Sequence, residues 1–232
     1  MHRIPLIALL APLTFFPVNY SLAAGIQIGK TRVIYNAQKK EVALPVVNKG
    51  TELPWLIQSW VDSGDGKTRG PFIVTPPLFR LDAETEQSLR IVWSGGALPQ
   101  DRESLFFINV RTIPASDKND DDKNVLRLIY KTRLKLFYRP EGLPGTPTEA
   151  CEHLQFSRSG ALLQVNNPSA YHIVFDSLYL NDRLLSEADT VAPKSTTSLP
   201  VNTAVMSGNV TWRCITDYGN ASEKFRGQLG NG

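Results

Sequence analysis

The stretch NVLRLIYKTRLKLFYRP, which runs from Asn124 to Pro140, decides the fold class. Every second residue from Leu126 to Leu136 is leucine, tyrosine or threonine. This period of two is typical of a β-strand with one buried face. It predicts one strand over Val125–Tyr138, about twice as long as the mean strand of roughly 5–6 residues, and the proline ends it. The basic residues of the second face are Arg127, Lys131, Arg133 and Lys135.

The same alternation recurs along the chain, and helical periodicity is nearly absent. In the first half, further strands are predicted at Gly25–Tyr35, Glu41–Val47, Trp55–Val61, Ser88–Trp93 and Leu105–Thr112. In the second half, strands are predicted at Leu154–Phe156, Leu162–Val165, Ile173–Leu180, Thr197–Pro200 and Asn209–Ile215. Many short alternating strands separated by turn residues indicate an all-β protein built of β-sandwiches.

One segment interrupts this pattern. The string RPEGLPGTPTEA begins at Arg139 and holds three prolines and two glycines in twelve residues. Such a composition is typical of a linker or an elbow. We therefore expect two β-sandwich domains, at residues 25–140 and 146–232.

Composition limits the class of partner. The chain has 232 residues, 42% of them hydrophobic and 20% charged, a net charge of +3 and a sequence pI of about 8.8. This is ordinary globular composition, with enough length for one large domain or two smaller ones. The mild basicity falls short of the concentrated positive charge of a nucleic-acid-binding domain.

The first residues predict a secretory signal peptide over residues 1–24. Arg3 precedes an apolar run from Ile4 to Val18, and small residues follow. Cleavage after Ala23 and cleavage after Ala24 are both left open. The apolar run is too short and too rich in proline for a spanning helix, and no later stretch is long enough. We expect an exported, soluble mature protein.

Cys151 and Cys214 are the two cysteines of the chain. In an oxidising compartment two thiols favour one disulfide. The alternative, two separately buried thiols, stays open.

The candidate motifs for catalysis and for metal binding lack residues that such motifs require. The string GDGKT at Gly64–Thr68 lacks the earlier glycine of a phosphate-binding loop, and NDDDKN at Asn119–Asn124 lacks the glycine and glutamate of a calcium loop. His153 and His172 have no partners at metal-ligand spacing. We expect no enzymatic activity, no metal and no cofactor.

The string LPQDRESLFFINVRTIP, from Leu98 to Pro114, carries a family resemblance. It resembles the signature of the periplasmic pilus chaperones, the immunoglobulin-like proteins that escort fimbrial subunits to an outer-membrane usher. Further stretches that look like the family are GKTRVIYN, VTPPLFRL with an expected cis proline, KLFYRP, NPSAYHI and TDYGN. The resemblance extends from about Gly25 to about Asn220 and implies two immunoglobulin-like domains in an L or boomerang arrangement.

The resemblance implies a function in the periplasm. A pilus subunit of this family's scheme lacks its last strand, and the chaperone donates one from its own sheet edge. The residues expected to fill the groove of the subunit are Leu126, Leu128 and Tyr130, although tyrosine departs from the aliphatic residue that the family uses. Leu134 and Leu136 are expected in the chaperone's own core. The implied partners are pilus subunits, including an adhesin, and the usher.

Charged residues are implied to set the register and the domain orientation. The family holds the C-terminal carboxylate of the subunit between an arginine and a lysine, which here are Arg32 and Lys135. Glu103, Arg139 and Asp217 match an inter-domain charge network. The short acidic loop between Pro114 and Asn124 resembles the branch that serves rod-like adhesive pili.

Two other classes of protein share some of these sequence features. A pilus subunit or adhesin is also exported and β-rich, but it should end in a penultimate tyrosine, and this chain ends in KFRGQLGNG. A carbohydrate-binding sandwich needs an exposed aromatic platform. The four tryptophans lie within strand patterns, where we expect them in the interior: Trp55, Trp60, Trp93 and Trp212. The cognate subunits and the self-association of the empty chaperone are left open.

Overall fold

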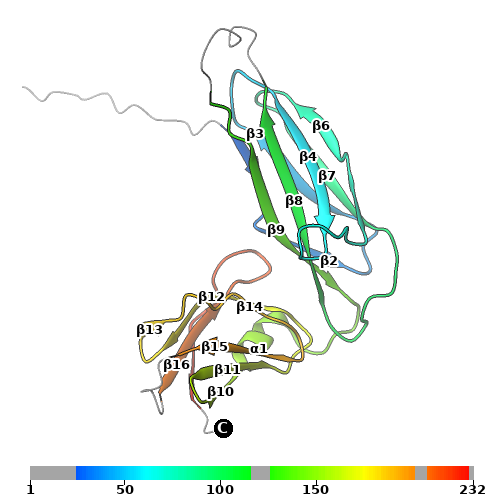
Figure 1. Ribbon diagram of the computed structural model, residues 1–232. Helices are drawn as coiled ribbons and strands as arrows, with labels where there is room; N and C mark the ends of the chain where they lie inside the picture. The colour runs from blue at the N-terminus through cyan, green and yellow to red at the C-terminus, as the bar shows by residue number, and fades with distance from the viewer. Residues whose placement is uncertain (1–24, 116–125, 202–207, 230–232) are drawn as a thin grey trace, which may run out of the picture.

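The computed structural model describes residues 25–115, 126–201 and 208–229. They form two β-sandwich domains that follow one another in the chain, and Figure 1 shows these as two bodies that meet at an angle. The predicted all-β class with two domains in a bent arrangement is confirmed. The predicted signal peptide and most of the loop between Pro114 and Asn124 lie outside the described residues. None of the described helices is long and apolar enough to cross a membrane.

The N-terminal domain packs two sheets face to face. One sheet has the strand order β1-β3-β7-β5 and the other the order β2-β9-β8-β4-β6. The strands are β1 (Ile26–Ile28), β2 (Arg32–Asn36), β3 (Val42–Asn48), β4 (Trp55–Asp62), β5 (Phe72–Thr75), β6 (Leu78–Leu81), β7 (Glu86–Trp93), β8 (Ser104–Pro114) and β9 (Tyr130–Arg139).

The core of this domain follows the period of two in the sequence. The buried apolar side chains of β3 are Val42, Leu44 and Val46, and those of β8 include Phe106, Ile108 and Val110. Leu136 is fully buried and Leu134 packs against the same core, as predicted. Alternate side chains point to opposite faces of a strand, so one face of each strand fills the space between the sheets.

The first predicted strand, Gly25–Tyr35, is in fact two strands in different sheets. Ile26–Ile28 pairs antiparallel with β3, whereas Arg32–Asn36 pairs parallel with β9. The chain therefore crosses from one sheet to the other between Ile28 and Arg32. As a result β2 covers only the last five residues of β9, from Lys135 to Arg139.

The predicted start of the long strand is wrong. β9 begins at Tyr130, and residues 126–129 have no regular secondary structure, while Val125 lies outside the described residues. The last pair that joins β9 to β8 is Tyr130 with Thr112, and β8 ends two residues later at Pro114, which has no N–H to donate. A segment without a paired neighbour does not form a strand, however regular its side-chain pattern.

Two further features of the N-terminal domain differ from the predictions. Strands β5 and β6 were not predicted, and they flank the cis peptide bond between Thr75 and Pro76. Trp60 is not in the interior. It lies half-buried on the outer face of its sheet, with the guanidinium of Arg111 5.2 Å from the centre of its ring.

The C-terminal domain packs a sheet of order β10-β11-β15 against a sheet of order β13-β12-β16-β17, to which β14 adds beside β12. Its strands are β10 (Gln155–Ser159), β11 (Leu162–Asn167), β12 (Ile173–Leu180), β13 (Arg183–Leu184), β14 (Thr190–Val191), β15 (Ser195–Pro200), β16 (Asn209–Cys214) and β17 (Phe225–Gln228). The sequence analysis did not predict the short strands β13, β14 and β17.

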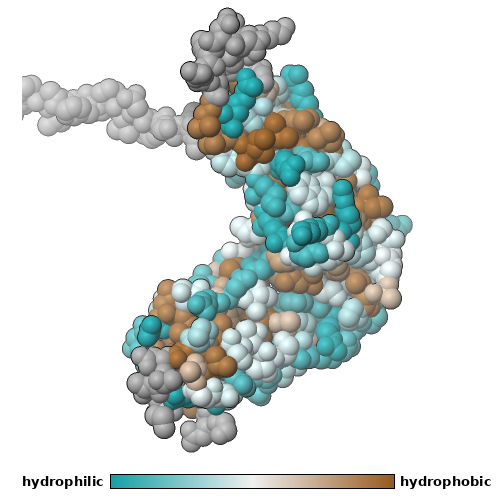
Figure 2. All heavy atoms as spheres, in the orientation of Figure 1, coloured by the Kyte–Doolittle hydropathy of each residue, from teal (hydrophilic) through white to brown (hydrophobic). Residues whose placement is uncertain are grey.

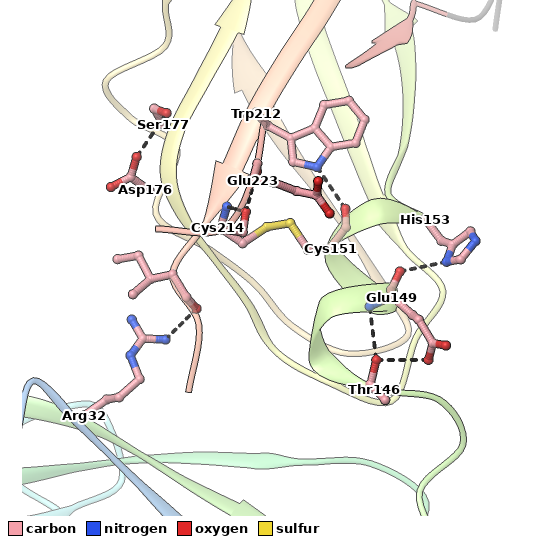
Figure 3. Close-up of a disulfide and its surroundings, with 12 residues drawn as sticks. Arg32, Thr146, Glu149, Cys151, His153, Asp176, Ser177, Trp212, Cys214 and Glu223 are labelled. Carbon is pink, nitrogen blue, oxygen red and sulfur yellow. Dashed lines mark hydrogen bonds between the residues drawn. A yellow bond between two sulfur atoms is a disulfide. The ribbon is translucent and has the colours of Figure 1, made fainter. Parts of the chain in front are cut away.

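A single short helix, α1 (Pro147–Glu152), lies among the described residues where a linker was predicted. Thr146 caps its N-terminus, because its side chain accepts a hydrogen bond from the Glu149 N–H at 3.2 Å. The helix carries Cys151 into the domain core, where it forms a disulfide with Cys214 of β16 (Figure 3). The alternative of two free thiols is therefore wrong.

Candidate functional site

The first half of β9 has a free edge. β9 pairs with β8 from Tyr130 to Tyr138, which is all but its last residue, but with β2 only from Lys135 onward. Among the described strands, none lies on the other side of Tyr130–Leu134. The backbone N–H and C=O groups of this half-strand that point away from β8 are therefore available to pair with an added strand.

Large apolar side chains lead into this edge. Their exposed fractions are 84% for Leu126, 51% for Leu128, 60% for Ile129 and 55% for Tyr130. They follow directly after residues 116–125, and Figure 2 shows hydrophobic residues gathered at that end of the N-terminal domain. A contiguous exposed apolar segment beside an unpaired edge is typical of a surface that binds another chain. Ile129 was missed by the sequence analysis, because it lies on the opposite parity to the predicted leucines.

Two cations stand where the free edge ends. Arg32 is the first residue of β2 and Lys135 is its direct Cα partner in β9. The parallel pairing of the strands thus brings together two residues that are far apart in the sequence. Five residues separate Lys135 from Tyr130, a distance of about 16 Å along a strand. The pair is therefore placed to bind one end of an added segment.

Arg32 reaches from the N-terminal domain to the C-terminal domain. Its Nη1 donates a hydrogen bond of 3.1 Å to the carbonyl oxygen of Ile215, as Figure 3 shows, and its guanidinium lies 5.8 Å from the ring centre of Phe137. Its Nε is buried and has no hydrogen-bond partner in the described residues. Burial lowers the pKa of Arg32, and the negative charges of Asp217 and Asp189 partly offset this effect. Arg32 thus keeps unused donor capacity beside a cavity.

Lys135 also contacts the C-terminal domain. Its Nζ lies 2.6 Å from Oδ1 of Asp189, and its own side chain is only 20% exposed. Asp189 precedes β14 and lies far from Lys135 in the sequence. The sequence analysis did not predict this ion pair, because the contact depends on how the two domains meet.

A cavity of about 180 Å³ lies between the domains next to Arg32. Arg32 and Phe137 line it from the N-terminal domain, and His172 and Tyr218 line it from the C-terminal domain. The disulfide between Cys151 and Cys214 forms part of its wall. The tyrosine side chain is 96% exposed, so the cavity opens to solvent beside an aromatic ring.

Arg139 joins three segments where the domains meet. Its Nε donates to Oε1 of Glu103 at 2.7 Å, and its Nη1 and Nη2 donate to the two oxygens of Asp217 at 2.7 and 2.9 Å. Glu103 in turn accepts the backbone N–H of His172 at 2.8 Å, and its side chain is 2% exposed. The sequence analysis predicted that Glu103, Arg139 and Asp217 act together, and the structure brings them into contact.

The two carboxylates of this network stabilise the charged form of Arg139. Burial by itself lowers the pKa of Arg139, but hydrogen bonds and charge interactions with Asp217 and Glu103 outweigh burial, so that the pKa is raised. The guanidinium also lies 5.3 Å from the ring centre of Tyr171. Arg139 thus links Glu103 of the N-terminal domain to Asp217 of the C-terminal domain through three charge-assisted hydrogen bonds.

A second network lies on the outer face of the sheet that contains β9. The Nη2 of Arg133 donates to Oδ1 of Asp62 at 2.8 Å and to the Gly64 carbonyl at 2.7 Å, and Asn109 donates to Oδ2 of Asp62 at 2.7 Å. Burial raises the pKa of Asp62, but these hydrogen bonds and the charge of Arg133 bring it below its usual range. The guanidinium of Arg133, which the sequence analysis placed only on the basic face of the strand, also lies 3.9 Å from the ring centre of Phe107.

In the part of the chain that the structure describes, no cluster of three or more His, Cys, Asp or Glu side chains is arranged to hold a metal ion. His153 accepts or donates only within α1, where its Nδ1 lies 2.7 Å from the Glu149 carbonyl oxygen. The site is therefore described by its open edge, its apolar segment and its two cations.

These features define a class of protein. Two immunoglobulin-like domains hold a sheet edge open, place apolar side chains beside it and close it with a pair of cations, which is the arrangement of a protein that binds an extended segment of another chain. Two family models match almost the whole described chain. They are the PapD N-terminal domain of pili and flagellar-assembly chaperones at residues 25–144, and the C-terminal domain of the pili assembly chaperone PapD at residues 149–226. The chain belongs to the family of pili assembly chaperones.

Several pili assembly chaperones are similar to this chain over nearly its full length. The chaperone LpfB of Salmonella typhimurium is 42% identical over 226 residues, with 96% of this chain and 97% of LpfB covered. The SafB chaperone, solved in complex with the SafA pilin of Salmonella enterica, is 32% identical with a TM-score of 0.81, and covers 90% of this chain and 98% of SafB. The periplasmic chaperone SfaE is 37% identical with a TM-score of 0.77, and covers 88% of this chain and 99% of SfaE.

Proposed function

We propose that this chain is a periplasmic chaperone that binds, folds and caps pilus subunits by donor-strand complementation and delivers them to an outer-membrane usher. The observation that carries the proposal is the free edge at Tyr130–Leu134, with exposed apolar side chains before it and two cations after it. SafB, which resembles this chain closely, is a chaperone that has been solved with a pilin.

The physical mechanism follows from the edge. A subunit that lacks its last strand exposes an apolar groove, and Leu126, Leu128 and Tyr130 are proposed to fill it at every second position. Each large side chain contributes roughly 1.5–3 kcal/mol when it leaves water. The hydroxyl of Tyr130 needs a hydrogen-bond partner or an exit to solvent, so its insertion is expected to be the shallowest of the three. Main-chain hydrogen bonds between the subunit and the edge of β9 add to this energy.

Arg32 and Lys135 are proposed to bind the C-terminal carboxylate of the subunit. A slip by one residue would turn every inserted side chain to the wrong face, so a strand donor needs a fixed end. Charge-assisted hydrogen bonds to a carboxylate contribute roughly 1.5–3 kcal/mol each and fix that end. The network of Glu103, Arg139 and Asp217 is proposed to hold the second domain so that the cleft has room for the subunit.

The remaining parts of the proposal concern organisation and location. Residues 1–24 are proposed as a signal peptide, with the chaperone domains at 25–140 and 146–232. The spans of the two family models support these ranges. The periplasmic relative SfaE and the disulfide, which requires an oxidising compartment, support the location. The chain is proposed to act without catalysis, since its relatives are chaperones.

Hydrogen exchange tests the proposal on the protein itself. The chaperone is co-expressed with the pilin of its own gene cluster, and exchange is compared between the free and the pilin-bound chaperone. We expect strong new protection of amides at Tyr130–Leu134, because an added strand pairs there, and little change at Leu136–Tyr138, which is already paired on both sides. A stable pilin complex without new protection at Tyr130–Leu134 would exclude strand addition at this edge.

A further inference from the structure

Lys135 already binds a carboxylate of its own chain. The Nζ of Lys135 lies 2.6 Å from Oδ1 of Asp189, which belongs to the other domain. The side chain of Asp189 is 71% exposed, so its carboxylate is open to solvent while it contacts the lysine.

The backbone of Asp189 is held firmly in this place. Its carbonyl oxygen accepts a hydrogen bond of 2.8 Å from the Phe175 N–H of β12. The next two residues form β14, in which Thr190 pairs with Val174 and Val191 with Ile173. The carboxylate therefore extends from a paired backbone and not from a free loop, which lowers the entropy cost of keeping it at Lys135.

The chemical groups involved are equivalent. A side-chain carboxylate and a C-terminal carboxylate carry the same charge and offer the same two acceptor oxygens to an ammonium group. The negative charge of Asp189 also acts on Arg32, where it favours the charged guanidinium. A carboxylate that arrives at Arg32 and Lys135 must therefore displace Asp189 or bind beside it against repulsion.

We propose that Asp189 is an internal competitor for the anchor, and that it sets the affinity of Arg32 and Lys135 for the carboxylate of the subunit. This inference rests on the anchor role given to the two cations above. Asp189 keeps Lys135 of the empty anchor paired, so that a peptide segment without a terminal carboxylate gains nothing there that would offset the loss of the ion pair. Chain ends are thereby favoured over internal segments. Because the carboxylate is exposed and screened by solvent, the effect on affinity is a few-fold.

The test uses the mature protein and sodium acetate as a minimal carboxylate. Acetate is titrated at pH 7, and sodium chloride is lowered as acetate is added so that the ionic strength stays constant. The NMR signals of the Lys135 side chain are followed during the titration. Asp189→Asn removes the competing charge, and Asp182→Asn, at the turn beyond the opposite end of β12, removes one exposed charge elsewhere. We expect the acetate midpoint at Lys135 to be about two- to fivefold lower in Asp189→Asn and unchanged in Asp182→Asn.

The outcomes of the acetate titration distinguish the competitor role of Asp189 from the anchor role of Arg32 and Lys135. Equal midpoints for Asp189→Asn and the wild type, with acetate still bound at Lys135, overturn the competitor role and leave the anchor role standing. Absence of any acetate response at Lys135 in all three proteins overturns the anchor role and the competitor role together. A midpoint lowered equally in Asp182→Asn assigns the effect to net charge and also overturns the competitor role. Raising the ionic strength should shrink the difference between Asp189→Asn and the wild type, because salt screens an exposed ion pair.

Discussion

Arg32 and Lys135 are direct Cα partners in the parallel pair of β2 and β9. The other pairs among the described strands are antiparallel, so this contact marks the point where the chain has crossed between sheets. The crossing leaves the first half of β9 without a neighbour on the side opposite β8 and places two cations at the end of that open half. One irregularity of the fold thus produces both the free edge and the pair of cations at its end.

The anchor gives the first prediction. Arg32→Ala and Lys135→Ala should each weaken capture of co-expressed pilin by about 10- to 100-fold, since each removes a charge-assisted hydrogen bond worth roughly 1.5–3 kcal/mol. Lys131→Ala is the matched control, because it lies in the same strand on the same parity but is exposed in the open half. Capture is measured by affinity purification from the periplasm, and melting temperatures verify folding. Wild-type capture by both anchor variants contradicts the anchor role.

The domain boundary gives the second prediction. Arg139→Met should lower the free energy of unfolding by about 3–5 kcal/mol, because it leaves the carboxylate of Glu103 buried without its cation. The double variant Glu103→Gln with Arg139→Met should be less destabilised than the single variant, since the buried charge is then absent. Urea denaturation measures both. If Arg139→Met is as stable as the wild type, the network does not hold the domains.

The disulfide gives the third prediction. Cys151 and Cys214 are 63 residues apart, and a bond that closes such a loop contributes up to about 4 kcal/mol in the chain-entropy model. Replacing both cysteines with serine should therefore lower the unfolding midpoint of the C-terminal domain and leave that of the N-terminal domain nearly unchanged. Hydrogen exchange resolves the two domains. Equal stability of the variant and the oxidised protein would show that the bond does not stabilise the domain.

Acid sensitivity gives the fourth prediction. The pKa of Asp62 is lowered in the folded protein, so its contribution to stability is fully present above about pH 4 and is lost as the pH falls through the lowered value. Asp62→Asn should accordingly be less stable than the wild type at pH 7, and the gap should narrow between pH 5 and pH 2. Melting temperatures across this range give the answer, with Asp176→Asn as an exposed control. A gap that stays constant with pH means that the ionised form of Asp62 is not what stabilises the fold.

Much of the fold follows from the period of two in the sequence. Val42, Leu44 and Val46 are buried as their alternation predicts, and the same holds for Leu136. The helix α1 was missed although Thr146 and Glu149 have the spacing of a capping box, because the surrounding prolines and glycines favoured a linker. Short strands such as β14 have too few residues to show any period.

The site was less predictable than the fold. Arg32 and Lys135 were found through the family resemblance, since their contact depends on the register of a parallel strand pair. Asp189 was not found at all, because its ion pair with Lys135 depends on how two domains meet. The start of β9 was placed too early because side-chain alternation continues through Leu126 and Leu128, while the backbone there has no neighbour to pair with.

The most direct measurement of the central claim compares two leucines that have the same parity in the opening stretch. Leu128 is 51% exposed and Leu136 is fully buried. Leu128→Glu should change the free energy of unfolding by less than about 0.5 kcal/mol, because it alters an exposed residue, and should abolish the pilin complex, because a charge cannot enter an apolar groove unpaired. Leu136→Glu should unfold the N-terminal domain. If Leu128→Glu destabilises the free protein as severely as Leu136→Glu, or still captures pilin at the wild-type level, Leu128 is not a donated residue and strand donation by this segment is contradicted.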